Sequence, residues 1–286
     1  MLLARLFLAT CLGLASPVLA QSSDGQTTQA PAEVSVAALS QALQLEALFD
    51  ALREEGLGYG ETLEADMFPG GGGPQWTAAV AAIYDPATLR ALFEASLQAE
   101  LGADPDAMTG ILAFFTTDLG KRVIGLEIEA RRAFLDTATE EAARVAAENR
   151  LANRDPKARL LERFIAAGDL VEMNVAGALS GNLAFMTGMS ETGVYGDAMP
   201  AEDLMSNVWA QEQQIRDDTT SWLYAYLGLA YDPLTEAELL TYIDFMESPE
   251  GKRLNAALFI AFNDVFRQVS HDLGRAAGLA MIGTDI

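Results

Sequence analysis

Apolar side chains recur at spacings of three and four residues along nearly the whole chain from residue 35 onward. Such spacing places side chains on one face of an α-helix, whereas a half-buried strand would alternate at every second residue. No stretch alternates for long enough to predict a strand. The pattern therefore predicts an all-α protein, folded as a helical bundle. One such stripe consists of Leu39, Ala42, Leu45, Leu48, Phe49 and Leu52.

Asp-Pro dipeptides divide this pattern and predict helix starts. They are Asp85-Pro86, Asp104-Pro105, Asp155-Pro156 and Asp232-Pro233. An Asp just before a helix accepts a hydrogen bond from a free backbone amide, and Pro in the first helical position loses only an N–H that has no partner there. We also interpret residues 58–60 as a turn that ends a helix. The expected helices span 35–55, 61–68, 75–84, 86–101, 105–116, 118–149, 156–186, 200–229, 234–247 and 249–280, with linkers at 69–74 and 187–200.

Two stretches of the chain match each other at a constant spacing. Each has a Phe, five further residues and then Gly-Lys-Arg, at Phe114 to Arg122 and at Phe245 to Arg253. The simplest interpretation is one helical unit in two tandem copies, over residues 35–150 and 155–286, that pack against each other. Chance similarity between amphipathic helices is the alternative, because periodicity alone produces apolar matches.

The first 20 residues have the pattern of a secretory signal peptide. Arg5 is followed by an apolar run from Leu6 to Ala15, and small residues end at Ala20. The run is shorter than the roughly 20 residues that span a bilayer, so we expect no stable membrane insertion after cleavage. Residues 21–34 are polar and lack periodicity, which predicts a disordered tether. We therefore expect a periplasmic or secreted protein.

The amino-acid composition excludes several classes of ligand and site. The 286 residues include 18 Lys plus Arg and 41 Asp plus Glu, for a net charge of −23, and one Cys and one His. So acidic a chain is unsuited to nucleic acid, whose binding depends on clustered cations. A single Cys and a single His exclude a Cys/His zinc site and a disulfide framework. We expect no metal and no cofactor.

The segment Leu234 to Phe266 resembles an uncharacterised family of exported bacterial proteins known as domain of unknown function 2059. The family pattern is a Thr, two acids, an apolar helix that ends in Phe, and then Ser-Pro-x-Gly-Lys. The first copy departs from this pattern at Thr117 and Asp118, where the family has Ser and Pro. The resemblance implies an exported all-helical protein of unknown activity, and it names no catalytic residue. The residues that carry it are Thr235, Glu236, Glu238, Leu239, Phe245, Ser248, Pro249, Gly251 and Lys252.

The two Gly-Lys-Arg motifs are candidate ligand-binding sites. Lys121 and Arg122 in the first copy, and Lys252 and Arg253 in the second, fall in the first turn of a predicted helix. Free amides and two cations at a helix start form a plausible cradle for an anion. Structural ion pairs with the many acidic residues are the alternative.

Glu127 and Arg131 form a second candidate site. They lie four residues apart on one face of a predicted helix, between two apolar stripes, so the helix is expected to be contacted on two sides. The matching positions in the second copy are Leu258 and Phe262, which we expect in the core. A partly buried carboxylate beside an Arg is suited to binding a polar group. An ordinary exposed helix pair is the alternative.

The sequence alone does not identify an activity. We expect a binding or scaffolding role in the cell envelope, for an unidentified ligand or protein. One alternative is a hydrolase that uses paired carboxylates on an envelope polysaccharide or peptide. The other is a structural homo-oligomer. The aromatic residues, which include Trp76, Trp209 and Trp222, allow two interpretations. They line a ligand groove between the two copies, or they belong to the apolar core.

Overall fold

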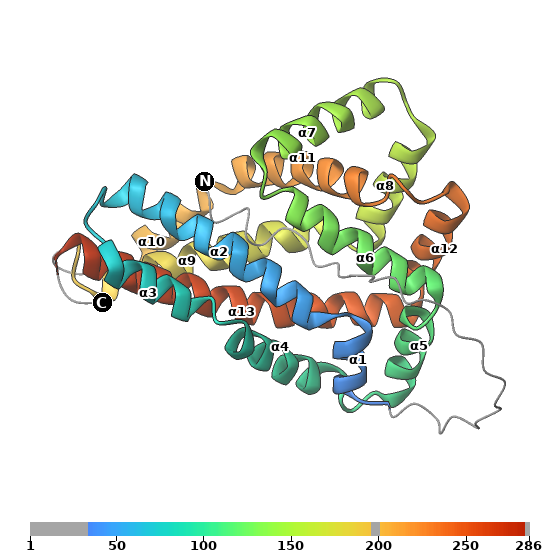
Figure 1. Ribbon diagram of the computed structural model, residues 1–286, viewed down its shortest axis with the longest axis horizontal. Helices are drawn as coiled ribbons and strands as arrows, with labels where there is room; N and C mark the ends of the chain where they lie inside the picture. Colours follow the sequence, from blue (N-terminus) through green and yellow to red (C-terminus); the bar gives the residue numbers. More distant parts are fainter. Residues whose placement is uncertain (1–33, 196–200, 284–286) are drawn as a thin grey trace.

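The computed structural model describes residues 34–195 and 201–283, and every regular element in this part of the chain is an α-helix (Figure 1). The predicted all-α class is therefore confirmed for these residues. None of the helices described is both long enough and apolar enough to cross a membrane. The helices are α1 (Val36–Ala42), α2 (Leu45–Met67), α3 (Gly73–Ile83), α4 (Pro86–Leu101), α5 (Pro105–Phe115), α6 (Asp118–Ala133), α7 (Thr137–Ala152), α8 (Pro156–Ala167), α9 (Leu170–Glu191), α10 (Ala201–Trp209), α11 (Glu212–Ala230), α12 (Glu236–Glu247) and α13 (Pro249–Met281).

The 33-residue helix α13 lies at the centre of the bundle. It packs along α9 over most of its length and also contacts α3, α4, α5 and α12 (Figure 1). Side chains from all the described helices except α7 join in one large apolar core, so both predicted copies contribute to the same interior. A small separate cluster of alanines fills the contact between α7 and α11.

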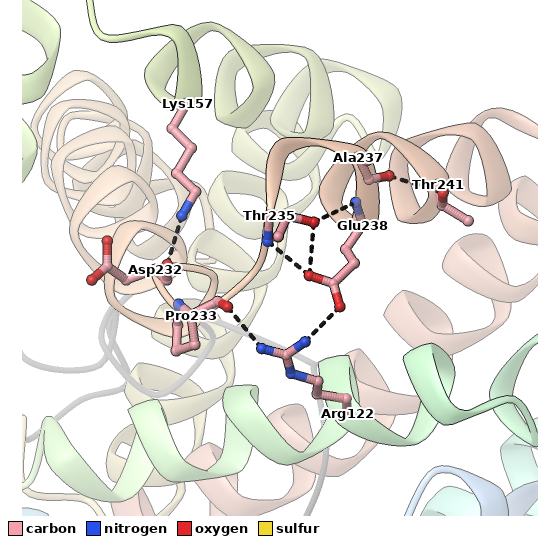
Figure 2. A network of polar contacts seen from close by, with 8 residues as sticks. All are labelled: Arg122, Lys157, Asp232, Pro233, Thr235, Ala237, Glu238 and Thr241. Atoms are coloured by element: carbon pink, nitrogen blue, oxygen red, sulfur yellow. Dashed lines mark hydrogen bonds and ion pairs between the residues drawn. The ribbon is translucent and has the colours of Figure 1, made fainter.

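The dipeptides Asp85-Pro86, Asp104-Pro105 and Asp155-Pro156 each begin a helix as predicted. The three Asp carboxylates accept hydrogen bonds from first-turn amides at 2.9, 3.1 and 2.8 Å. Asp232-Pro233 does not begin one, because α12 is capped by Thr235 through a capping box with Glu238. The Asp232 carbonyl instead accepts a hydrogen bond from Lys157 at 2.6 Å (Figure 2).

The predicted turn at residues 58–60 is wrong, because α2 continues without a break from Leu45 to Met67. Gly60 faces Val80 on α3, and Gly56 faces Tyr84, the residue directly after α3. A Cβ atom on Gly60 would lie 2.6 Å from Val80, and one on Gly56 would overlap the ring of Tyr84. These glycines therefore allow close packing between helices instead of ending a helix.

Four of the predicted long helices are divided by short turns. The breaks lie at residues 43–44, 134–136, 168–169 and 210–211. Gln44 and Asp169 adopt left-handed backbone conformations with φ of 48° and 49°, and Asp136 caps α7. Apolar periodicity misses such breaks, because both neighbouring helices direct their stripes to the same core. The predicted linker at 187–200 begins later than expected, since α9 extends to Glu191, and residues 196–200 lie outside the described part of the chain.

Candidate functional site

The helix pairs α5–α6 and α12–α13 share the same local geometry at their turns. Thr117 Oγ1 accepts a hydrogen bond from Gly120 N at 2.9 Å, and Ser248 Oγ accepts one from Gly251 N at 3.0 Å. A Cβ atom on either glycine would clash with the carbonyl oxygen of the Phe six residues earlier. Each Gly-Lys-Arg motif therefore lies in the first turn of its helix, as predicted, and its glycine lets the preceding helix end close by.

The two pairs face each other reciprocally. The rings of Phe114 and Phe245, which the sequence match aligns, stack at 4.1 Å between centroids with 9° between their planes. Arg122 on α6 donates to Glu238 on α12 at 2.5 Å and to the Pro233 carbonyl at 2.7 Å (Figure 2). Arg253 on α13 donates to the carboxylate and the carbonyl of Glu100 in the last turn of α4, and its Nε lies 4.0 Å from the carboxylate of Asp104, which caps α5. Each arginine thus contacts the residues that lead into the other pair.

Both arginines of the Gly-Lys-Arg motifs therefore already donate hydrogen bonds to acceptors within the protein. Lys121 and Lys252, beside them, are exposed. Ligand binding by these four residues therefore stays a prediction, and the observed arginine contacts correspond to the structural alternative.

Glu127 and Arg131 are both buried in the interior, with 0% and 2% of their surface exposed. The alternative of an ordinary exposed pair is therefore wrong. The Tyr231 hydroxyl donates to the Glu127 carboxylate, and the Tyr226 hydroxyl donates to the Glu127 carbonyl at 2.6 Å. Arg131 donates to the Glu55 carboxylate on α2 at 2.6 Å. A buried polar network therefore connects α2, α6 and α11.

Burial sets the protonation of this network. It raises the pKa of Tyr226 and Tyr231 well above the usual value, and the negative charge of Glu127 raises both further. Both phenols therefore stay protonated at neutral pH and act as donors. Burial also raises the pKa of the Glu55 carboxyl, while the Arg131 guanidinium opposes that rise.

A surface pocket with a volume of about 390 Å³ opens above this network. We call it the acidic aromatic pocket, because three carboxyl side chains and three aromatic rings line it. Glu55 belongs to both, and one-fifth of its side chain remains exposed. The pocket is thus connected to the buried network through Glu55 and Arg131. Its lining residues are Glu54, Glu55, Gly58, Tyr59, Thr62, Phe134, Leu135, Thr137, Glu140 and Trp222.

Packing of the rings holds the walls of this pocket in place. Trp222 stacks on Tyr226 with 4.5 Å between centroids and 11° between planes. Phe134 meets the Trp222 ring edge to face at 5.7 Å. On α7, Glu140 accepts hydrogen bonds from Arg144 at 2.7 and 3.1 Å, so its charge is partly neutralised.

Sequence reasoning identified Glu127 and Arg131 of the buried network, and Trp222 as a candidate groove residue, but missed the other residues that line the pocket. Phe134 and Leu135 lie in the turn between α6 and α7, which was predicted as continuous helix. One signal was present in the sequence: Asp136 with Thr139 is a typical helix cap, and its carboxylate accepts from the Thr139 amide at 3.1 Å. The pocket residues of α2 between positions 54 and 59 were not predicted, because Gly58 and Gly60 were interpreted as a turn that ends the helix.

Residues 87–149 match the profile of a bacterial family. That family is described as "Uncharacterized protein conserved in bacteria (DUF2059)". The match supports the family that the sequence resemblance named. The DUF2059 stretch extends from α4 through most of α7, so it includes Glu127, Arg131 and Glu140 but not residues 234–266.

No curated protein matches this chain. No solved structure matches it either. Within the described ranges, His, Cys, Asp and Glu side chains form no group of three or more that could hold a metal ion.

Proposed function

We propose that the protein is a periplasmic binding protein for an organic cation, with the acidic aromatic pocket as its site. One observation carries this proposal: carboxyl groups and aromatic rings converge on the same cavity of about 390 Å³. Cations are attracted to the faces of aromatic rings as well as to carboxylates. A volume of this size is typical of small-molecule sites.

The charge distribution favours a cation in this pocket. Glu54 is exposed, and the two cations nearby, Arg131 and Arg144, are each already paired with another carboxylate of the pocket, Glu55 and Glu140 respectively. The net charge of −23 draws positive ligands toward the whole molecule. A bound ammonium group would also lower the pKa of Glu55, whose burial raises it, so binding would release protons in mildly acidic solution.

Calorimetric titration of the chain from residue 21 onward tests this function. The ligands are choline, agmatine and spermidine, with 3,3-dimethyl-1-butanol as the neutral analogue of choline. We expect at least one cation to bind and the neutral analogue to bind less tightly. Absence of binding by all three cations, or equal binding of choline and its analogue, would contradict the proposal.

A matched pair of variants locates the site. Glu54 and Glu141 are both exposed, but only Glu54 lines the pocket. We expect Glu54→Gln to weaken cation binding by roughly threefold to fivefold, the value of a solvated ion pair. Glu141→Gln should leave binding unchanged, and equal losses in both variants would show a general charge effect.

We also infer that residues 35–150 and 155–286 are tandem copies of one helical unit, in which α5–α6 corresponds to α12–α13, and that residues 1–20 are an export signal. The shared caps, the two tightly packed glycines and the stacked phenylalanines support the duplication. The signal peptide is supported by its sequence pattern. N-terminal sequencing of the protein from the periplasmic fraction should begin at Gln21.

A carboxylate-based hydrolase is the second candidate function. The observation that favours it is the raised pKa of Glu55, in a pocket that also holds Glu54 and Glu140. Glycoside hydrolysis uses two carboxyl groups that flank the scissile bond, and the one that acts as general acid has a raised pKa. Mass spectrometry of peptidoglycan fragments incubated with the protein should then show cleavage, and Glu55→Gln should abolish it.

A structural homo-oligomer is the third candidate. Met205 and Trp209 on α10 are exposed apolar side chains at 49% and 57%, and Met281 and Ile282 are exposed at the end of α13. Both segments lie at the same end of the bundle (Figure 1). Exposed apolar surface of this kind is typical of association sites. Light scattering would show a dimer or larger species if these residues associate.

A further inference from the structure

A second hollow lies between α9 and α13, and none of its lining residues belongs to the acidic aromatic pocket. It has an outer pocket of about 300 Å³ and, behind it, an inner cavity of about 40 Å³. Asn174 on α9 and Phe259 on α13 line both spaces. These two side chains therefore form the partition between the surface pocket and the core.

The side-chain oxygen of Asn174, Oδ1, is unusual for a polar atom in a buried position. Only 4% of the residue is exposed, and its Nδ2 donates to the Leu170 carbonyl at 2.7 Å. Its Oδ1 is buried and accepts no hydrogen bond from any described residue. A buried acceptor without a donor destabilises a fold, and such atoms call for an explanation such as an unobserved ligand.

An ordered water in the inner cavity is the competing explanation. A buried water needs between two and four polar partners. The donors of the other two polar side chains on this wall are already engaged: Asn255 Nδ2 donates to the Gly168 carbonyl at 2.8 Å, and the Tyr242 phenol interacts with Tyr231 and Glu127. The rest of the wall is apolar. The cavity therefore provides poor hydrogen bonding for water.

The outer pocket indicates what kind of molecule could supply the donor. Although the chain has a net charge of −23, no Asp, Glu, Lys or Arg lines this pocket. Its walls are mostly apolar, with Met173, Phe259 and Ile260 among them. Its few polar groups are two carboxamides and the Ser180 hydroxyl. An uncharged and mainly apolar ligand fits this lining, because a charged one would lose its hydration without gaining a partner.

We propose that this pocket binds an uncharged, mainly apolar molecule with one hydrogen-bond donor, an alkyl alcohol or amide, and that the Asn174 carboxamide turns toward the ligand so that Oδ1 accepts from this donor. The alkyl part lies against Met173, Phe259 and Ile260. This site differs from the cation site in position and in ligand chemistry, so either can be present without the other.

The test compares three ligands of nearly equal size on the chain from residue 21 onward, by calorimetric titration. They are 1-octanol, which has a donor, 1-methoxyheptane, which has the same heavy atoms but no donor, and octanoate, which is charged at neutral pH. We expect 1-octanol to bind roughly tenfold more tightly than 1-methoxyheptane, the value of one hydrogen bond to a buried acceptor, and octanoate to bind more weakly. No binding of 1-octanol, or equal affinity of any two, would overturn the proposal.

Matched variants assign the preference to Asn174. Asn182 is a second buried Asn on α9 that lines neither space. Asn174→Leu should abolish the preference for the alcohol over the ether, while Asn182→Leu should preserve it. Preserved discrimination in Asn174→Leu, with an unchanged circular dichroism spectrum, would show that Oδ1 is not the acceptor.

Two further variants complete the design. Ala176 is exposed and lines the outer pocket, so Ala176→Phe should block both uncharged ligands without disturbing the core. Unchanged binding in this variant would place the ligand elsewhere and overturn the assignment. Glu54→Gln, which weakens the cation site, should leave binding of 1-octanol unchanged.

Discussion

In the first helix pair, α6 buries Glu127 and Arg131, whereas in the second pair α13 buries Leu258 and Phe262 at the aligned positions. The turns before these helices are nearly identical in their caps and glycine contacts. The expectation that Leu258 and Phe262 belong to the core is confirmed. Two helix pairs with the same turn geometry can therefore bury charged side chains in one pair and apolar side chains in the other, about two to three helical turns further along.

The neighbours of each helix account for this difference. Around α6, the helices α2 and α11 bring Glu55 and Tyr226 to the buried pair, and Tyr231 follows directly after α11. Around α13, the ring of Phe262 lies 4.4 Å from that of Phe93 and 6.4 Å from that of Phe49. A buried charge is tolerated only where such partners exist.

The largest effect is expected from breaking the buried ion pair of the first helix pair. Arg131→Phe introduces the residue of the second pair but leaves the Glu55 carboxylate without its buried cation. We expect it to lower the free energy of unfolding by about 3–5 kcal/mol, the usual cost of removing one partner of a buried pair. Urea unfolding followed by circular dichroism measures the change.

The double variant Glu127→Leu with Arg131→Phe sharpens this test. It makes α6 resemble α13 at both positions, and Glu55 can take up a proton at its partly exposed position. We therefore expect the double variant to be more stable than Arg131→Phe alone. Additive losses would show that the two side chains do not act as a unit.

An intermediate effect is expected from the two glycines at the turns. Gly120→Ala and Gly251→Ala each place a Cβ atom against a backbone carbonyl, which cannot rotate away as a side chain does. We expect each to destabilise the protein by about 1–3 kcal/mol in thermal or urea unfolding. Gly125→Ala is the control, because a Cβ atom there meets nothing within 4 Å, and it should stabilise α6 by up to about 1 kcal/mol. A large loss of stability for only one of the two alanine variants would show that the two turns are not structurally equivalent.

The smallest effect is expected at the helix caps. Thr117→Ala and Ser248→Ala each remove the side-chain oxygen that accepts from a first-turn glycine amide. Each should lower stability by about 1 kcal/mol, and by similar amounts in the two pairs. Thr109→Ala, in the exposed interior of α5, should change stability by less than either cap variant. Equal changes in all three would mean that capping contributes nothing here.

Particular elements show how far sequence patterns reach in this protein. Asp85, Asp104 and Asp155 were predicted as helix starts, and the structure confirms them because caps depend on residues that are adjacent in the chain. The turn at residues 58–60 was wrongly predicted, because the sequence does not distinguish a glycine that ends a helix from one that, like Gly60, lies against a neighbouring helix. The acidic aromatic pocket was not predicted, since its walls come from α2, from the turn between α6 and α7, from α7 and from α11.

The all-α class, many of the helix starts and the two similar turns could be predicted from the sequence, because these depend on contacts within a few residues. The burial of Glu127 and Arg131, the contact of Glu55 with Arg131 and the meeting of carboxyls and rings in one pocket depend instead on the tertiary fold. Burial and pairing depend on which helices become neighbours. That choice is made by packing across the whole core, which no local pattern specifies.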